Sequence, residues 1–426
     1  MDANPGPERP RNPWAWIPTL YFAEGIPYVV VMTLSTVMYK NLGISNTAIA
    51  LYTSWLYLPW VIKPLWSPFV DLFRTKRFWI VSLQFVIGLA FALVALTLPG
   101  PRFFQLTLAV FWLMAFSSAT HDIAADGFYL LALPPGLQAA FVGVRSTFYR
   151  MASLSAQGGL VYLAGYWQDA TGSVTRAWAL VFGLLAAVFT VVSAYHFLAL
   201  PKPASDRATA SGEGFGREFF AVFAAFLKKP DILTTLALLL LYRLAESQAL
   251  KLVSPFLLDP PSAGGLGLTT KQVGIAYGTV GIIALTIGGL VGGWIISIFG
   301  LRRMVWPMIL IMHTPNVAFL LLAVFQPSSL WIVATALAVE QFGYGFGFTA
   351  YMMYMMMVAE GPHKTAHYAI CTGFMALGMM LPGMGAGWIE DHIGYVKFFG
   401  WVLVCMIPSF IVVARLKIDP AFGRKT

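Results

Sequence analysis

The chain has 426 residues, of which 58% are hydrophobic and 11% charged, and its mean hydropathy is +0.74. A soluble domain does not need that much apolar surface, so the composition excludes a soluble globular protein and indicates a membrane protein. The net charge of +9 comes from short basic clusters between apolar runs, a pattern typical of membrane topology rather than of nucleic-acid binding. Cys371 and Cys405 lie in apolar runs, so neither a disulfide framework nor a metal site is expected.

The apolar runs predict an all-α membrane protein with twelve spans, because each span needs about 20 apolar residues. In chain order we expect helices at 14–39, 48–70, 78–98, 103–133, 139–167, 176–200, 231–258, 271–299, 305–325, 328–358, 366–389 and 394–416. The first run is too long for the apolar core of a signal peptide and lacks a small-residue cleavage site, so it should remain a span.

The longest polar segment, 201–230, is rich in Pro, Ser and Gly and is predicted to be a cytoplasmic linker. It separates an N-terminal six-helix bundle over 1–200 from a C-terminal six-helix bundle over 231–426. With both termini in the cytoplasm, most basic residues outside the spans fall on the cytoplasmic side. This bias predicts a multi-pass protein with both ends inside. The outer loops then hold Lys40, Arg102, Arg176, Lys271 and Lys397.

Weak matches between the two bundles recur at an offset of about 222 residues. The Ala-Glu pair ending in Glu24 matches the pair ending in Glu246, and segment 164–169 matches segment 386–391. Parallel repeats around a central linker indicate the major facilitator plan, in which the substrate site lies between two six-helix halves.

Short basic turns follow the second and eighth spans at corresponding places in the two halves. In the major facilitator superfamily such turns resemble the intracellular gating loop. We therefore predict that Asp71, Arg74 and Arg77 act in gating.

The most unusual span is 103–133, because it contains Asp122 and Asp126 inside an apolar run. A charge at membrane depth costs roughly 2.5 to 3.5 kcal/mol, so both should face protein or water. Four residues apart on a helix, they lie on one face. Arg145 and Arg150 occupy the next span, and we expect them to pair with these aspartates. Either the pairs only fix helix packing, or they form a switch that responds to protonation.

Four further charged positions lie at mid-depth in the spans that the repeat relates. Glu24 and Glu246 are equivalent, Arg243 comes one turn before Glu246, and Lys251 about one turn after it. His121, beside Asp122, is interpreted either as a proton relay or as a histidine satisfied by neighbouring helices.

Three motifs in the first half carry a family resemblance. They read KPLWSPFVD over 63–71, HDIAAD over 121–126, and YR at 149–150 followed by GGL at 158–160. The chain thereby resembles the AmpG-type muropeptide permeases and the related acetyl-coenzyme A transporters. The resemblance implies proton-driven import of anhydro-muropeptides into the cytoplasm for peptidoglycan recycling. It also implies that the two aspartates of the second motif are the essential carboxylates.

We accordingly expect a proton symporter of the bacterial inner (cytoplasmic) membrane that works by alternating access as a monomer, without cofactor or metal. Its partners would be protons, the lipid bilayer and an anionic small molecule. The residues predicted to couple protons are Asp122, Asp126, Glu24 and Glu246. Those predicted to hold the substrate are Arg150, Arg243, Lys251 and Arg145, since a cationic cavity offsets the desolvation of substrate carboxylates.

Two alternatives remain open from the sequence. The same fold could carry another solute, such as a coenzyme A ester, a siderophore or a drug. His121 also stands where the resembled permeases have Gln, and Gly127 follows the second aspartate where they often continue with Ala-Trp-Lys. A membrane-embedded acyltransferase using His121 and Asp122 is disfavoured, because no surrounding catalytic constellation accompanies the pair.

Overall fold

The computed structural model describes residues 12–207 and 215–423, except for the side chains of Pro68, Asp71, Leu72, Pro135, Ala139, Val142 and 215–219. In this part of the chain every regular element is helical. Lipid offers no hydrogen-bond partners, so a spanning chain must satisfy its backbone internally, as a helix does. Among the described residues, seven continuous helical stretches, some made of several consecutive elements, are long and apolar enough to cross a membrane.

The first half of the chain forms the N-half, which we define as η1 to α9. It starts with the short η1 (Pro13–Ala15). Its longer helices and their π-helical segments are α1 (Ile17–Val29), η2 (Val30–Leu34), α2 (Ser35–Asn41), α3 (Asn46–Trp55), α4 (Leu58–Leu72), α5 (Lys76–Thr97), α6 (Phe103–Ala132), α7 (Pro135–Leu154), η3 (Ser155–Leu160), α8 (Val161–Thr171) and α9 (Val174–Ala199).

The second half of the chain forms the C-half, α11 to α19, after the connecting helix α10 (Phe215–Leu227). Its elements are α11 (Ile232–Leu241), α12 (Leu244–Leu258), η4 (Pro261–Ala263), α13 (Thr270–Val273), η5 (Gly274–Gly281), α14 (Ile282–Phe299), α15 (Leu301–His313), η6 (Thr314–Asn316), α16 (Val317–Phe325), α17 (Leu330–Ala359), α18 (Lys364–Val404) and α19 (Ile407–Val413).

Each predicted span corresponds to a helical stretch, although several of the stretches are broken. The second span is divided between α3 and α4, and the seventh is interrupted at Arg243, whose backbone leaves the helical region. Conversely, α18 covers the predicted span 366–389 and continues, after a kink at Gly394 where φ is 76°, into the first part of the predicted span 394–416. Helix α19 forms the last part of that span. The all-helical fold expected from the apolar runs is therefore confirmed, while the boundaries of individual helices differ.

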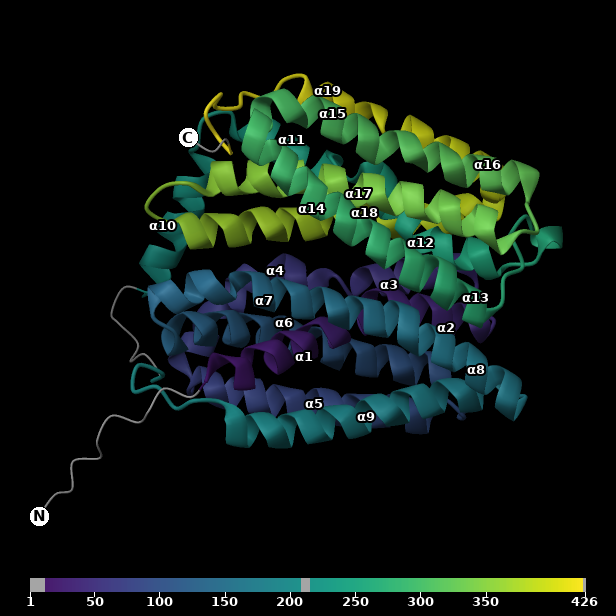
Figure 1. Ribbon diagram of the computed structural model, residues 1–426, viewed down its shortest axis with the longest axis horizontal. Helices are drawn as coiled ribbons and strands as arrows, with labels where there is room; N and C mark the ends of the chain where they lie inside the picture. The colour runs from purple at the N-terminus through teal and green to yellow at the C-terminus, as the bar shows by residue number, and fades with distance from the viewer. Residues whose placement is uncertain (1–11, 208–214, 424–426) are drawn as a thin grey trace, which may run out of the picture.

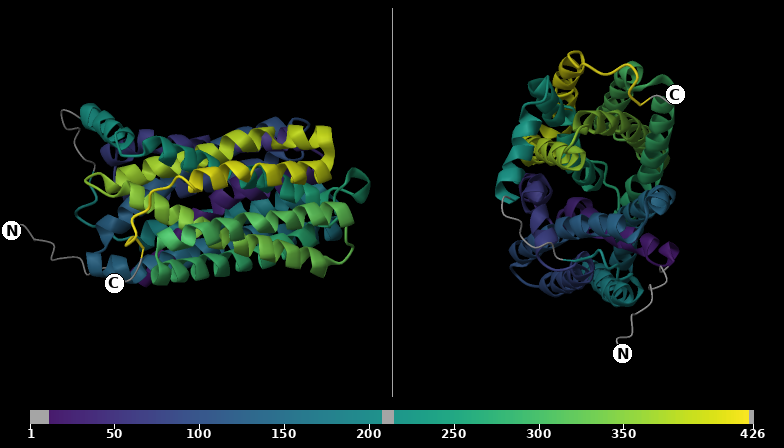
Figure 2. Two further views of the ribbon diagram at one scale, coloured as in Figure 1. Left: turned by 90° about the horizontal axis from the view of Figure 1, so that it is seen from above. Right: turned by 90° about the vertical axis from the view of Figure 1, so that its left-hand side faces the viewer.

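The two halves lie side by side with their helices roughly parallel. Figure 1 shows the purple-to-teal helices of the N-half below the green-to-yellow helices of the C-half, and Figure 2 shows the same division from one end. The described chain begins and ends at the same end of the molecule, at the left of Figure 1. We call this the terminal end, and the other the distal end.

The halves pack most closely at the distal end, through helices that carry glycine at the contact. A Cβ atom on Gly387 of α18 would lie 2.0 Å from the carbonyl oxygen of Asn46, and one on Gly278 of η5 would lie 2.0 Å from that of Gln157 in η3. Only a residue without a side chain permits this approach. Glycine therefore allows the two halves to close together at this end.

The segment predicted as a linker, 201–230, contains structure that its polar composition did not indicate. Helix α10 occupies its second part, and residues 208–214 lie outside the described chain. In its first part Asp206 is buried, and its carboxylate accepts hydrogen bonds from the backbone N–H groups of Lys76 (2.7 Å) and Arg77 (3.0 Å). These two N–H groups belong to the first turn of α5, so Asp206 satisfies donors that the helix itself cannot.

Replacing Asp206 by Ala is expected to lower the free energy of unfolding by about 1–2 kcal/mol, because two buried N–H groups lose their acceptor. Thermal unfolding of the purified protein in detergent measures the change. Asp419→Ala is the matched control, since Asp419 accepts one backbone hydrogen bond at an exposed site. Equal effects of the two substitutions would contradict a special role for Asp206.

Candidate functional site

A cavity of about 660 Å³ lies between the two halves. Its wall is formed in the N-half by α1, Tyr57 and α4, the first residue of α5, α6 and α7, and in the C-half by Arg243 and α18. A cavity of a few hundred Å³ between two halves of a protein is typical of a small-molecule site. The position predicted from the internal repeat, between the halves, therefore contains a real cavity.

The cavity reaches the terminal end. Its lining runs from Tyr57 and Met379 at mid-depth to Lys76, Leu131 and Thr365, which lie at or next to the terminal ends of α5, α6 and α18. At the distal end the halves are joined by side-chain contacts described below. The cavity is thus accessible from one end and closed at the other.

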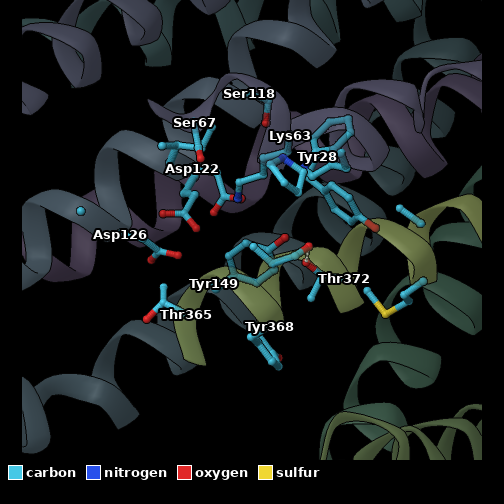
Figure 3. Close-up of a pocket in the computed structure, with 18 of the residues that line it drawn as sticks. Tyr28, Lys63, Ser67, Ser118, Asp122, Asp126, Tyr149, Thr365, Tyr368 and Thr372 are labelled. Carbon is cyan, nitrogen blue, oxygen red and sulfur yellow. Dashed lines mark hydrogen bonds and ion pairs between the residues drawn. The ribbon is translucent and has the colours of Figure 1, made fainter. Parts of the chain in front are cut away.

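An acidic cluster forms one wall of the cavity. Glu24 of α1, Asp122 and Asp126 of α6 all line it, and one carboxylate oxygen from each lies within 4.8 Å of the others. Figure 3 shows Asp122 and Asp126 pointing into the same space from successive turns of α6. The spacing of four residues places them on one helix face, as the sequence predicted.

Each aspartate of the cluster has its own cation. Lys63 of α4 forms an ion pair with Asp122, and Arg145 of α7 forms one with Asp126 at 2.5 Å. The hydroxyl of Tyr21 also donates a hydrogen bond to Asp126, at 3.2 Å. The predicted pairing of Asp126 is confirmed for Arg145. The prediction that Arg145 or Arg150 pairs with Asp122 is wrong, because the ammonium group of Lys63 reaches it across the cavity wall.

Glu24 differs from the two aspartates in its partners. Its side chain is only 7% exposed, and its Oε2 atom has no hydrogen-bond partner in the described chain. Its equivalent in the C-half, Glu246, accepts two hydrogen bonds from the Arg243 guanidinium, at 2.9 and 3.2 Å. The two positions related by the repeat therefore have different electrostatic surroundings.

The four residues predicted to hold substrate are placed differently. Arg243 lines the cavity, held by Glu246 and by a hydrogen bond of 2.7 Å to the Tyr344 hydroxyl. Lys251 is buried between the halves, donates a hydrogen bond of 3.0 Å to Thr53 Oγ1, and is not part of the cavity lining. Arg145 and Arg150 also lie outside the lining.

The positions predicted to act in gating lie at the terminal end, next to the start of α5. Arg74 adopts a positive φ of 73° and places its guanidinium over the ring of Phe78. Arg77 donates a hydrogen bond to the carbonyl of Phe197 and lies over its ring, so it joins α5 to α9. The side chain of Asp71 lies outside the described part of the structure.

His121 points away from the cavity into the N-half. A chain of hydrogen bonds, buried except at Thr19, joins His121 Nε2 to the side chain of Gln84, then to His196 and to Thr19, with distances of 2.8 to 3.0 Å. Of the two interpretations offered by the sequence, the contacts favour a histidine satisfied by neighbouring helices.

A polar network at the distal end joins the halves, and sequence reasoning missed it. Asn46 of α3 donates hydrogen bonds to Glu390 (2.6 Å) and to the hydroxyl of Tyr395 (2.8 Å), both in α18. Lys40 of α2 forms an ion pair of 2.6 Å with Asp259, which follows α12. We call these five residues the distal lock. Its members are hundreds of residues apart, so no local pattern could have revealed it.

Solved structures share this arrangement of helices over nearly the whole chain. A bacterial homologue of the human lysosomal transporter Spinster, in an inward-facing conformation, has a TM-score of 0.71 at 15% identity and 96% coverage of both chains. A D-xylose–proton symporter has a TM-score of 0.64 at 12% identity, covering 97% of this chain and 99% of its own. The chain therefore has the fold of these membrane transporters.

The family follows from the sequence match. The model of the BT1 family matches residues 24–326, and the chain belongs to this family. Among its relatives, the anhydromuropeptide permease of Escherichia coli K12 is 25% identical over 95% of this chain and 79% of its own. A putative transporter AmpG 4 of Rickettsia conorii is 24% identical over 93% of this chain and 94% of its own. The expected resemblance is thereby confirmed.

Proposed function

We propose that this protein imports anhydro-muropeptides into the cytoplasm together with protons, by alternating access across the bacterial inner membrane. The observation that carries the proposal is the cluster of three carboxylates on the wall of a cavity open at one end only, with Lys63 and Arg145 paired to two of them. Groups that can exchange protons therefore lie where a substrate would bind. The name of the Escherichia coli relative supports the choice of substrate.

The chemistry of the cavity fits an amphipathic, anionic glycopeptide. Tyr28, Tyr57 and Trp60 supply aromatic surface, with the rings of Tyr28 and Trp60 meeting edge to face at 5.2 Å. Aromatic faces of this kind bind the apolar faces of sugar rings. Arg243 and Lys76 also line the cavity and are suited to the carboxylates of a peptide stem.

Orientation follows from the distribution of basic residues. If the terminal end is cytoplasmic, as the excess of Lys and Arg favours, the cavity described here faces the cytoplasm. This state is then the one that releases substrate after import. The region of Asp71, Arg74 and Arg77 lies beside its mouth, where it would act in opening and closing.

Gradient-driven uptake tests the proposal. Labelled anhydro-muropeptide is offered to right-side-out membrane vesicles with and without an inward proton gradient. We expect the gradient to raise wild-type uptake, and Asp126→Asn to remove the gradient's effect, because Arg145 then loses its counter-ion in the cluster. Expression and detergent gel filtration check that the variant is folded.

Two outcomes would count against the proposal. Normal gradient-driven accumulation by Asp126→Asn would remove this carboxylate from the coupling mechanism. A folded wild type that takes up no muropeptide would exclude this substrate. Competition with a coenzyme A ester, a siderophore or a drug would then identify the class of solute that the cavity binds.

A further inference from the structure

We propose that Glu24 is the residue that takes up and releases the coupled proton. In the state described here, Asp122 and Asp126 are instead each paired with a basic side chain. The inference rests on the proposed proton-coupled transport, and it assigns the proton to one of four acidic residues. It follows from how the charges of the cluster are partnered.

Three carboxylates meet in the cluster, but each of its two nearest cations is already engaged. Lys63 binds Asp122 and Arg145 binds Asp126. Glu24 makes no ion pair in the described chain, although one of its oxygens lies within 4.8 Å of oxygens from both aspartates. An ionised Glu24 would add a third negative charge beside two others in a poorly solvated place, which is unfavourable unless a cation joins it.

Burial of Glu24 points the same way. Its side chain is 93% buried but lines the cavity, and its Oε2 atom has no hydrogen-bond partner. Protonation makes this carboxyl group neutral, whereas an ionised oxygen in the same position would be an unpaired buried charge. Within the described chain, Glu24 is thus the one carboxylate of the cluster without a cation, and it belongs to a residue that lines the cavity.

Comparison of the two halves explains why the glutamate without a counter-ion lies in the N-half and not in the C-half. In the C-half, Arg243 stands three residues before Glu246 and binds it with two hydrogen bonds. The residue three positions before Glu24 is Tyr21, which carries no charge and donates its hydroxyl hydrogen bond to Asp126 instead. Glu246 therefore has a permanent counter-ion, and Glu24 lacks the corresponding one.

A proton fits this position better than a metal ion. A hard metal cation such as Ca²⁺ takes six or more oxygen ligands, and Mg²⁺ is equally demanding in its geometry. Here the aspartate oxygens are engaged by an ammonium and a guanidinium group, whose positive charges would repel a metal ion. The charged and titratable groups around Glu24 are Tyr21 on its own helix, Lys63 on α4, Asp122 and Asp126 on α6, and Arg145 and Tyr149 on α7.

The transfer itself balances without any further reactant. In the state open to the terminal end, protonated Glu24 gives its proton to a water molecule in the cavity, leaving a carboxylate and a hydronium ion. In the state open to the distal end, the carboxylate accepts a proton from water on that side. One proton thus crosses the membrane with each cycle in which the cavity changes sides.

Infrared titration of the purified protein tests the assignment without any substrate. A protonated carboxylic acid has a carbonyl stretch that disappears when the acid ionises. We expect the wild type to lose such a band as the pH rises, and Glu24→Gln to lack it from the start. Replacement of K⁺ by Na⁺ at constant pH should leave the band unchanged.

Glu340→Gln is the matched control. Glu340 is also a buried glutamate without an ion pair in the described chain, but it lies in α17, accepts a hydrogen bond of 2.8 Å from Gln341 and does not line the cavity. Its replacement should leave the band that Glu24→Gln removes. Glu24→Asp, which restores a carboxyl group, should restore a titrating band and thereby exclude loss through misfolding.

Three results would overturn the assignment. They are bands that titrate identically in the wild type and in Glu24→Gln, a band removed by Asp126→Asn but not by Glu24→Gln, and a band abolished by Na⁺, which would indicate a metal site. The transport readout is separate: in vesicles, Glu24→Gln should reduce muropeptide accumulation to the level seen without a gradient. If the wild type transports no muropeptide, the proposed substrate fails while the infrared result still decides the proton site.

Discussion

Replacing Asp122 by Asn is expected to reduce gradient-driven uptake at least ~100-fold. The Lys63–Asp122 pair has both side chains only 24% exposed, so the substitution leaves an ammonium group without a counter-ion on the cavity wall. Breaking such a pair costs about 3 kcal/mol or more, which corresponds to a factor of more than ~100. Uptake in vesicles measures the loss of transport, and thermal unfolding in detergent measures the loss of stability.

The double variant Lys63→Met/Asp122→Asn separates the two effects. Removing both charges restores electrical neutrality, and buried ion pairs can often be replaced by uncharged residues at little cost in stability. We therefore expect the double variant to recover the thermal stability that Asp122→Asn loses, but not transport. Recovery of transport would show that the pair serves only to pack α4 against α6.

Replacing Asn46 by Ala is expected to shift the protein away from the state described here. Asn46 donates hydrogen bonds to Glu390 and Tyr395 across the two halves, and accepts one of 2.8 Å from Lys40 within the N-half. Its loss leaves the buried carboxylate of Glu390 without this donor, at a cost of about 2 kcal/mol. That cost falls only on the state with a closed distal end, so its population relative to the distally open state should drop roughly 30-fold.

Distances between spin labels measure this shift. Arg102 and Ser262 are exposed at the distal end of the N-half and the C-half, and both native cysteines are buried, so labels can be directed to Arg102→Cys and Ser262→Cys. Asn46→Ala should increase the population with a long distance between the labels. Asn316→Ala is the control, because Asn316 is also a buried asparagine but bonds within the C-half. An unchanged distance distribution in Asn46→Ala would show that glycine-mediated packing alone holds this end closed.

Local patterns in the sequence were sufficient for the plan of the molecule. Twelve apolar runs predicted the helical stretches, because a span is recognised by its own length and composition. Asp122 and Asp126 were placed on one helix face because the helical repeat is a local property. The motifs over 63–71 and 121–126 predicted the family resemblance, and both contribute residues to the cavity wall.

Contacts between distant segments were not predictable in the same way. Lys63 falls within the motif over 63–71, but its pairing with Asp122 was not predicted, because it depends on how α4 and α6 pack. Asp206 was assigned to a linker, yet it satisfies the start of α5. The distal lock joins Asn46 to Glu390 across 344 positions, and nothing near either residue indicates the other.

The sequence by itself determined the membrane class, the helical spans, the internal repeat and the acidic face of α6. The first two and the last follow from the composition and periodicity of single segments, and the repeat follows from the match of one segment to another. The tertiary structure alone decided which charges meet. Side chains form ion pairs over a few ångströms, and those distances depend on the packing of helices from different parts of the chain. For the same reason, only the structure distinguished Glu24, which lacks a counter-ion, from Glu246, which has Arg243.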